Sequence, residues 1–454
     1  MRVSAQPNQP LGGDRKLPRL RVNGHRLETR NTTQPFFWLA DTAWELLQRL
    51  TKPEIDHYLE IRAAQGFNVI QVVGLSEQGE LRANALGQTP LLEKNPPTPN
   101  PDYWTLLDWV LGRAERLGLH IALLPTWADK VTPGWGGGPV IFDPDNARIY
   151  GAWLAERYMG ASNLIWMLGG DRAPVYHSDK YPNGYADFRE IWRGMAAGIL
   201  EHSPEALITY HTAGGVQNRT SLSLHDEPWL MFNTVQSGHG GGQDLPVWDW
   251  ITDDLQRTPA KPVLDAEANY EDHPVNPWPS YDPANGYFRD HDVRKQCWRG
   301  VLAGAAGVTY GHHAVWQYLA PGRENINFAD RTWLEAIHRP GALQVGIMRR
   351  WLEAFLPLRE PAQEVIRSAV GEGASHVRAA RDLDWHRRAV YVPNSQTLRI
   401  NLEPLAGEHV KASWFDPRNG QLEGIGTFSA TGERLFSTPI SAPDWVLAFE
   451  VTNQ

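Results

Sequence analysis

The chain has 454 residues, of which 42% are hydrophobic, and it carries a formal net charge of −9. This length exceeds what one hydrophobic core usually holds, so we expect a large domain and a smaller one. An acidic balance without a long run of Lys or Arg argues against nucleic acid or an anionic membrane as a partner. The single cysteine, Cys297, excludes an intrachain disulfide and a cysteine-based zinc site.

The first 20 residues are polar and contain no apolar segment that would serve as a signal peptide or a membrane span. We therefore expect a cytoplasmic protein, or a secreted one whose leader has been removed. Residues 20–27 have Asn23-Gly24 at their centre, a pair that predicts a small hairpin. Residues 1–32 are interpreted as an N-terminal extension with short strands.

Between residues 33 and 357, short apolar runs alternate with segments of helical period, which indicates repeated βα units and a parallel sheet. The eight expected strands are 36–40, 69–73, 120–124, 164–168, 207–210, 230–233, 263–266 and 307–310. The expected helices are 52–65, 103–117, 146–159, 185–201, 244–256, 293–306 and 330–345. This pattern predicts a (β/α)8 TIM barrel, because the sequence has no Gly-x-Gly-x-x-Gly fingerprint of a doubly wound sheet.

The helical period fades after residue 358, and turn pairs such as Asn419-Gly420 and Thr431-Gly432 separate short alternating runs. Regular spacing of such runs predicts an antiparallel β-sandwich over residues 358–454. The expected strands are 364–368, 376–381, 388–393, 397–401, 410–416, 424–429 and 445–451.

Two expected barrel strands end in a carboxylate. The run from Asn163 stops at two glycines and Asp171, and the run from Pro262 stops at Glu267. Active-site residues of TIM barrels lie at the C-terminal strand ends. Glycoside hydrolysis needs a pair of carboxylates, one as acid and the other as nucleophile or base. A separation of about 5–5.5 Å would predict a retaining mechanism, and about 6.5–9.5 Å an inverting one.

Strand parity places Asp265 and Glu267 on one face, and it points Asp171 into the barrel if the two glycines stay extended. Asp265 is a rival nucleophile, interpreted as a deeper carboxylate that orients Arg or His neighbours. A helix N-cap, or an ion pair with Arg172 or Arg189, explains Asp171 about equally well from spacing alone.

Further polar and aromatic residues follow other strands. Asp41 could bind a hydroxyl group or cap a helix, while His211, Gln236 and His312 follow the fifth, sixth and eighth strands. Trp44 lies at the rim after the first strand, and Trp127 and Trp316 are the tryptophans expected to stack on sugar faces. No His-x-x-x-His or His-Glu-x-x-His spacing occurs, so we expect no metal and no cofactor. The absence of a Gly-x-Ser-x-Gly elbow argues against serine nucleophile chemistry.

Five strings occur in an order that resembles the apiosidase-like glycoside hydrolases: Asp41 to Trp44, Arg62 to Gln71, Trp166 to Asp171, Asp265 to Tyr270 and Tyr310 to Trp316. The C-terminal part, with Trp414 to Gly420, is similar to the collagen-binding-type sandwich that usually follows this barrel. We discount collagen binding, because no feature of the sequence supports it.

The resemblance implies a retaining, exo-acting β-D-apiosidase acting on plant glycosides or pectic side chains. Asp171 is similar to the family's acid/base and Glu267 to its nucleophile. Two glycines before Asp171 would let the backbone approach the sugar and compensate for the short side chain. The expected substrate-binding residues are Asp41, Trp44, Gln71, Trp127, Arg172, His211, Gln236, Tyr270, His312 and Trp316. An exo-glycosidase for arabinofuranosides or galactosides, and a non-catalytic carbohydrate-binding barrel, remain alternatives.

Overall fold

The structure is a computed structural model that describes residues 16–77, 79–134, 137–239, 242–277, 280–403 and 405–452. Residues 1–15 of the expected N-terminal extension lie outside the described residues. The expected hairpin is confirmed, with β1 (Leu20–Asn23) paired antiparallel to β2 (Arg26–Thr29). Among the described residues, no helix has the length and apolar character needed to cross a membrane.

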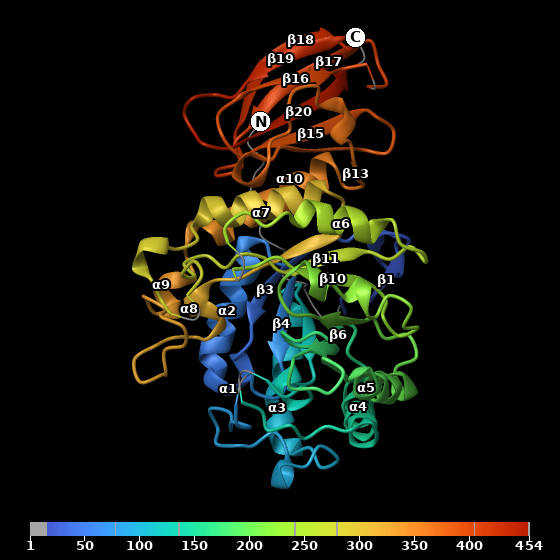
Figure 1. The fold of residues 1–454 in the computed structure, drawn as a ribbon, viewed down its shortest axis with the longest axis vertical. Coiled ribbons are helices and arrows are strands. Elements are labelled where there is room, and N and C mark those ends of the chain that lie inside the picture. Colours follow the sequence, from blue (N-terminus) through green and yellow to red (C-terminus); the bar gives the residue numbers. More distant parts are fainter. Residues whose placement is uncertain are drawn as a thin grey trace.

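The large domain is a near-closed barrel of parallel strands, as the sequence predicts (Figure 1). Its strands, in spatial order, are β10 (Asn233–Gln236), β11 (Val263–Glu267), β12 (Gly307–Tyr310), β3 (Trp38–Ala43), β4 (Val69–Val73), β5 (His120–Leu124), β6 (Leu164–Gly169) and β9 (Ile208–His211). The hydroxyl of Thr234 on β10 donates a hydrogen bond to the carbonyl of Tyr210 on β9, which brings the first and last strands of this order together.

Helices surround the barrel (Figure 1). They are α1 (Leu46–Arg49), α2 (Lys52–Gln65), α3 (Pro101–Arg116), α4 (Pro144–Tyr158), α5 (Arg189–His202), α6 (Val247–Leu255), α7 (Asp290–Leu302), α8 (His313–Trp316), α9 (Trp333–Ala336) and α10 (Pro340–Phe355). Thr51 caps α2 as expected, because Glu54 accepts hydrogen bonds from its N–H and hydroxyl at 2.8 Å each.

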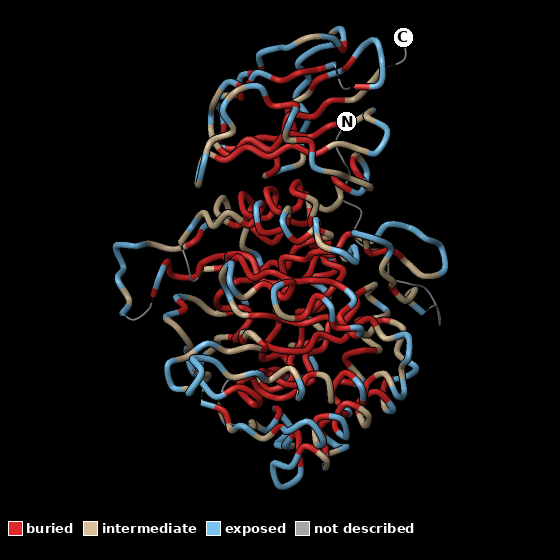
Figure 2. Tube along the Cα trace, turned by 45° about the vertical axis from the view of Figure 1, so that its right-hand side comes forward, coloured by how far each residue is buried: buried red, intermediate tan, exposed pale blue. Residues whose placement is uncertain are grey.

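Every barrel strand is buried on both faces (Figure 2). Trp38, Ala40 and Ala266 pack in one cluster inside the barrel. Leu39, which lies between the first two on β3, packs instead in a cluster with residues of α7 and α10. The two faces of β3 therefore pack against different layers, the barrel interior and the surrounding helices, although both faces are apolar.

Several expected elements differ from the structure. The expected helix 185–201 begins only at Arg189, because Tyr185–Asp187 form β8, which pairs antiparallel with β7 (Val175–His177). The sixth strand starts at Asn233, because Met231 before it donates its N–H to the carbonyl of Ile208 and Phe232 packs in the interior cluster. The expected helix 330–345 is divided into α9 and α10, since Pro340 fixes a new helix start and lacks the N–H that a continuous helix requires.

The C-terminal domain is antiparallel, as expected. One sheet has the order β13 (Glu360–Pro361), β14 (Arg378–Arg381), β15 (Arg387–Val392), β20 (Trp445–Thr452), β17 (His409–Phe415) and β18 (Leu422–Ser429), and a separate pair joins β16 (Thr397–Asn401) to β19 (Glu433–Ser437). The expected strand at 364–368 is wrong, because Gln363–Val365 form a 3-10 turn, and β19 was not expected.

The smaller domain lies over α6, α7 and α10 (Figure 1). Trp298 of α7 stacks on Tyr391 of β15 with an interplanar angle of 2°. Arg294 of α7 binds both carboxylate oxygens of Asp444 at 2.8 and 2.7 Å, and all of these side chains are buried. Such a buried apolar and ionic contact fixes this domain against the barrel helices.

Candidate active site

A cavity of about 410 Å³ lies at the C-terminal ends of the barrel strands. Both candidate catalytic carboxylates, Asp171 and Glu267, line it. Five of the expected substrate-binding residues line it as well: Trp44, Trp127, Gln236, Tyr270 and Trp316. The barrel therefore brings together residues from five strand ends and from segments that are far apart in the sequence.

Asp171 reaches the cavity by a route that strand parity did not predict. Gly169 and Gly170 have φ values of 85° and 128°, and Asp171 itself has φ of 55°, so the chain leaves the extended conformation after Leu168. A Cβ at Gly170 would lie 2.7 Å from Trp127 Cδ2, and one at Gly169 would lie 2.3 Å from the carbonyl oxygen of His211. The glycines thus permit close approach of this backbone to Trp127 and His211.

Asp171 neither caps α5 nor pairs with Arg189, although the charge of Arg172 does act on its carboxylate. Arg189 pairs with Asp187 at 2.6 Å, and Phe188 occupies the N-cap of α5. Arg172 donates to the backbone carbonyl of Asp171 at 2.8 Å and does not line the cavity. The carboxylate of Asp171 is left facing the cavity.

The end of β11 is also irregular. Val235 pairs with Asp265, but the next residue, Gln236, pairs with Glu267, so the register shifts at this point. Ala266 faces the barrel interior, and Asp265 lies on the opposite side, where the hydroxyl and N–H of Ser237 donate to its carboxylate. The expectation that Asp265 orients Arg or His neighbours is wrong, since its partner is Ser237. Burial raises the pKa of Asp265 to about 7.

The two cavity carboxylates have opposite pKa shifts. Burial raises the pKa of Asp171 to about 6, and the negative charge of Glu267 adds to this effect against Arg172 and His211. Burial alone would also raise the pKa of Glu267, but the hydrogen bond and charge of His211, with His239 and Tyr270, bring it below its ordinary value. Divergent pKa values are what an acid and a nucleophile require.

Aromatic side chains form one wall of the cavity. Trp44 donates its indole N–H to the hydroxyl of Tyr270 at 2.8 Å and meets Trp127 at a centroid distance of 5.2 Å. Trp316 donates to Nδ1 of His313 at 3.4 Å. These contacts fix the ring orientations, which suits them to pack against the apolar faces of a sugar.

Two of the expected binding residues do not line the cavity. One lies on the outer face of its strand, and the other lies too deep in the barrel. Asp41 lies on the outer face of β3, where it accepts hydrogen bonds from Tyr58 and Arg62 of α2. Gln71 faces the interior but lies deep, with its amide bound to the hydroxyl of Thr309 and the carbonyl of Ala266. The structure gives both residues structural partners outside the cavity lining.

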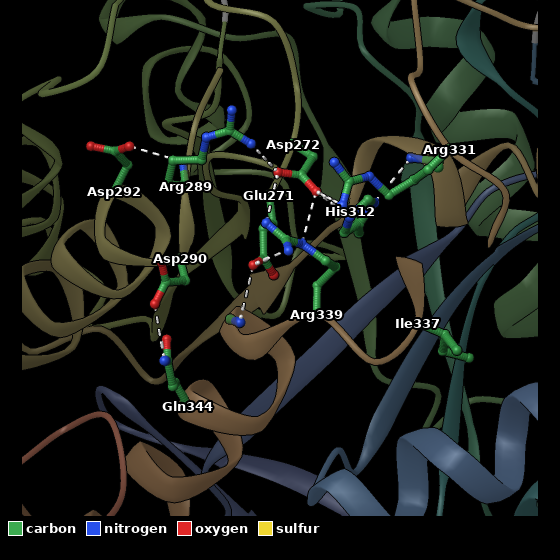
Figure 3. Close-up of polar contacts among 12 residues, drawn as sticks. Glu271, Asp272, Arg289, Asp290, Asp292, His312, Arg331, Ile337, Arg339 and Gln344 are labelled. Atoms are coloured by element: carbon green, nitrogen blue, oxygen red, sulfur yellow. Dashed lines mark hydrogen bonds and ion pairs between the residues drawn. The ribbon is translucent and has the colours of Figure 1, made fainter. Parts of the chain in front are cut away.

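His312 also has a structural role. Figure 3 shows it bound to Asp272, which further accepts from Arg339 at 2.9 Å and Arg331 at 3.3 Å. Burial alone would raise the pKa of Asp272, but the hydrogen bond and charge of His312 and the two arginines hold it well below its ordinary value. This cluster fixes the segments that follow β11 and β12.

His211 lies behind the cavity wall and supports it. Its Nδ1 accepts a hydrogen bond from the N–H of Asp171 at 3.3 Å, and its Nε2 lies 3.1 Å from Oε2 of Glu267. A ring that accepts through Nδ1 carries its proton on Nε2 when neutral. The proton is therefore on the nitrogen nearer Glu267, although this N–H is not aligned for a hydrogen bond with the carboxylate.

Several lining residues were not expected from the sequence. Glu77 follows β4, His239 follows β10, His273 follows β11, and Asn327 lies in the segment after α8. The rings of His239 and His273 lie 4.1 Å apart. Each of these residues is in a loop, several positions beyond a strand or helix end. A carboxylate in the segment after a barrel strand was the available signal for Glu77.

A metal site is not indicated where the structure describes side chains, since no group of three or more His, Cys, Asp or Glu residues there is arranged to hold an ion. The two carboxylates with opposite pKa shifts, Asp171 and Glu267, are the groups in the cavity lining that are suited to acid and nucleophile roles. These groups and their aromatic surroundings match the requirements of glycoside hydrolysis.

Comparison with known proteins agrees with the geometry. Residues 22–358 match the family model described as "Apiosidase-like, catalytic domain", and residues 361–450 match "Putative collagen-binding domain of a collagenase". A solved structure titled "Glycoside hydrolase" is 30% identical, with a TM-score of 0.83, covering 96% of this chain and 97% of that one. No match was found among curated proteins.

Two further solved structures extend the comparison. A glycoside hydrolase family 5 structure from Bacteroides vulgatus ATCC 8482 is 28% identical, with a TM-score of 0.84, covering 96% of this chain and 95% of that one. A GH30 endoxylanase from Clostridium papyrosolvens C71 is 11% identical, with a TM-score of 0.52, covering 95% of this chain and 99% of that one. The endoxylanase shares the fold alone.

Proposed function

This chain belongs to the apiosidase-like glycoside hydrolases, and we propose that it is a retaining, exo-acting β-D-apiosidase. It is a glycosidase. The proposed substrates are plant glycosides or pectic side chains that end in a β-apiofuranosyl unit. The observation that carries this proposal is the pair Asp171 and Glu267, which share one cavity and have opposite pKa shifts.

In the proposed first step, a carboxylate oxygen of Glu267 attacks the anomeric carbon of the terminal sugar. Asp171 gives its proton to the departing glycosidic oxygen, so that the leaving group departs as an alcohol. Burial and the charge of Glu267 keep this proton on Asp171 at a higher pH than an ordinary aspartate would. The products of this step are the free aglycone and a glycosyl ester of Glu267.

In the proposed second step, Asp171 has become a carboxylate and removes a proton from water. The water oxygen then bonds to the anomeric carbon as the ester bond to Glu267 breaks, which returns both carboxyl groups to their starting states. Two inversions at one carbon give net retention. His211, which faces Glu267 at 3.1 Å, stabilises the carboxylate that leaves.

The cavity supports binding of a terminal sugar. Its volume of about 410 Å³ is at the small end of the range for small-molecule pockets, about 300–1,000 Å³. Trp44, Trp127 and Trp316 would pack against the sugar ring, and Gln236 and Tyr270 would bind hydroxyl groups. A second candidate, hydrolysis of terminal arabinofuranosides or galactosides, uses the same carboxylates and differs only in the sugar bound.

Released monosaccharide measured on a panel of aryl glycosides tests the proposal. The panel contains β-D-apiofuranoside, α-L-arabinofuranoside and β-D-galactopyranoside with one common aglycone. We expect the highest kcat/KM on the apioside. In methanol-containing buffer, NMR of the methyl glycoside formed should show the substrate's anomeric configuration. A preference for another sugar would overturn the apiose assignment, and inverted configuration would overturn the retaining mechanism.

A further inference from the structure

A third acidic side chain, Glu77, lines the cavity together with Asp171 and Glu267. It is only 6% exposed, and neither step of the proposed hydrolysis uses it. Burying a carboxyl group is costly, so an acid inside a binding cavity has to be stabilised by its partners or carried in its neutral form.

The segment that carries Glu77 is held firmly against its neighbours. Nζ of the buried Lys130 donates to the carbonyl of Ser76 at 3.2 Å. The N–H of Gly79 donates to Asp129 at 3.1 Å, and the N–H of Glu77 itself donates to Glu45 at 3.4 Å. Contacts on both sides of Glu77 therefore fix its position at the cavity wall, which is the preorganisation that a binding residue needs.

The charges around Glu77 oppose its ionisation. Burial raises its pKa well above the ordinary value, and the negative charges of Glu45, Asp171, Glu267 and Asp129 raise it further. On the segment after β5, the charge of Lys130 is engaged by Asp129, which it contacts at 2.6 Å. The guanidinium groups of Arg82 and Arg49 each lie 3.2 Å from the carboxylate of Glu45. The charge of Lys130 also acts on Glu77, but its contact with Asp129 offsets this effect, so negative charge prevails around Glu77.

We propose that Glu77 is a substrate-binding residue whose neutral carboxylic acid donates a hydrogen bond to a hydroxyl group of the sugar held beside Glu267. A protonated carboxyl group offers one O–H donor and one carbonyl acceptor, and a sugar hydroxyl can accept from the first and donate to the second. The inference rests on the proposed glycosidase site, because it assigns the sugar to the cavity that Asp171 and Glu267 share.

Neutral Glu77 also has an electrostatic consequence. The transition state of glycoside hydrolysis has oxocarbenium character, and Glu267 supplies the negative charge that it needs. A second fixed carboxylate would raise the pKa of Asp171 further and compete for the same proton. When Glu77 stays neutral, Asp171 remains the group that gives and receives the proton, and Glu267 remains the group that carries the negative charge.

The first experiment compares Glu77→Gln, Glu77→Ala and the matched control Glu80→Gln. Glu80 is in the same loop, but its side chain is 71% exposed and pairs with Lys94. We expect Glu77→Gln to keep kcat/KM within about 10-fold of the native value, because an amide also donates and accepts. Glu77→Ala should lose roughly 100-fold, because the sugar hydroxyl loses its partner. Glu80→Gln should match the native enzyme.

A second experiment identifies the hydroxyl group. Native enzyme and Glu77→Ala are compared on the parent aryl glycoside and on analogues that each lack one hydroxyl. We expect one analogue to lose roughly 10-fold or more with native enzyme and to lose no further activity in Glu77→Ala. If, for every analogue, the loss caused by the missing hydroxyl multiplies with the loss caused by Glu77→Ala, the assignment of Glu77 to a sugar hydroxyl is overturned.

A direct readout of protonation completes the test without turnover. The infrared spectrum of the native enzyme at neutral pH should contain a carbonyl band of a protonated carboxyl group that is missing in Glu77→Gln. Identical spectra would overturn the neutral state of Glu77, as would equal losses of activity in Glu77→Gln and Glu77→Ala. Native activity in Glu77→Ala would overturn the binding role. A folding defect in Glu77→Ala leaves the Gln variant and the spectrum to decide.

The comparison is made on whichever glycoside the native enzyme hydrolyses fastest. If that glycoside is not an apioside, the proposed substrate falls while the test of Glu77 still stands. If an apioside is preferred and the Glu77 variants behave as the control does, the inference on Glu77 falls alone.

Discussion

Nε2 of His211 lies 3.1 Å from Oε2 of Glu267, and Nδ1 of the same ring accepts the N–H of Asp171 at 3.3 Å. One buried side chain at the end of β9 thus contacts the ends of both strands that deliver the proposed catalytic carboxylates. It fixes the backbone of one and stabilises the charge of the other.

Replacing His211 by Ala should lower kcat/KM roughly 10- to 100-fold, because its imidazole lies 3.1 Å from the carboxylate of Glu267 and helps to keep the pKa of that group low, and a polar contact with a charged group contributes about 1.5–3 kcal/mol. The pKa of Glu267 should rise, so the acidic limb of the pH profile should move to higher pH. His239→Ala is the matched variant, since His239 Nε2 lies 3.5 Å from Oε1 of Glu267, and a smaller shift is expected. An unmoved acidic limb in His211→Ala would contradict this role.

Glu267→Ala should reduce turnover by about 10⁴-fold or more while leaving the fold intact, because the variant has no nucleophile. Azide should restore activity on an aryl glycoside and yield a glycosyl azide, which NMR identifies. Asp265→Asn is the control, because Asp265 binds Ser237 away from the cavity. If Asp265→Asn is the inactive variant and Glu267→Ala is active, the nucleophile has been assigned to the wrong residue.

The pH dependence of kcat/KM should be bell-shaped. Asp171 has to be protonated to act as an acid, and its pKa is raised to about 6, so activity should fall as pH rises above about 6. Glu267 has to be ionised, and its pKa is lowered, so activity should be lost only below the ordinary range of a glutamate. Asp171→Asn should remove the alkaline limb. If the alkaline limb persists in Asp171→Asn, a group other than Asp171 is responsible for it.

Asp41→Ala should destabilise the fold by about 3–5 kcal/mol, because it leaves Arg62 buried without its carboxylate partner at 2.6 Å. Activity per folded molecule should remain close to native, since Asp41 does not line the cavity. Chemical denaturation measures the first effect and active-site titration the second. Asp56→Ala, which breaks a surface pair with Arg113, should cost about 0–1 kcal/mol. A large loss of activity in stable Asp41→Ala would restore a binding role.

Gly170→Ala should reduce both stability and activity. The residue has φ of 128°, and its new Cβ would lie 2.7 Å from the ring of Trp127. We expect a loss of about 1–3 kcal/mol and a displaced Asp171, with kcat/KM lowered on substrates that need acid catalysis. Gly184→Ala also has a positive φ, 74°, but no atom lies within 4 Å of its Cβ. Equal behaviour of the two variants would show that backbone strain, and not the contact with Trp127, decides the effect.

The sequence determined the fold class and both strand ends that carry the proposed catalytic pair. Apolar runs at regular spacing predicted the barrel because each parallel strand is buried on both faces, and the turn pairs predicted the antiparallel domain. The strand ends at Asp171 and Glu267 could be recognised in the sequence, because a carboxylate directly after an apolar run interrupts the hydrophobic pattern. The hairpin at 20–27 and the cap at Thr51 rest on local backbone chemistry, which needs no tertiary information.

Only the tertiary structure decided which polar side chains face the cavity. A strand that is apolar on both faces does not reveal which face points inward, so nothing in the sequence decided that Asp41 lies on the helix side of β3, or that Ala266 and not Asp265 faces the interior. The positive φ values from Gly169 to Asp171 break the alternation on which the expected orientation of Asp171 depended, yet Asp171 still lines the cavity. Glu77 belongs to the site because closure of the barrel places its loop at the same end as Asp171 and Glu267. The sequence does not show this proximity, because the three residues are far apart along the chain.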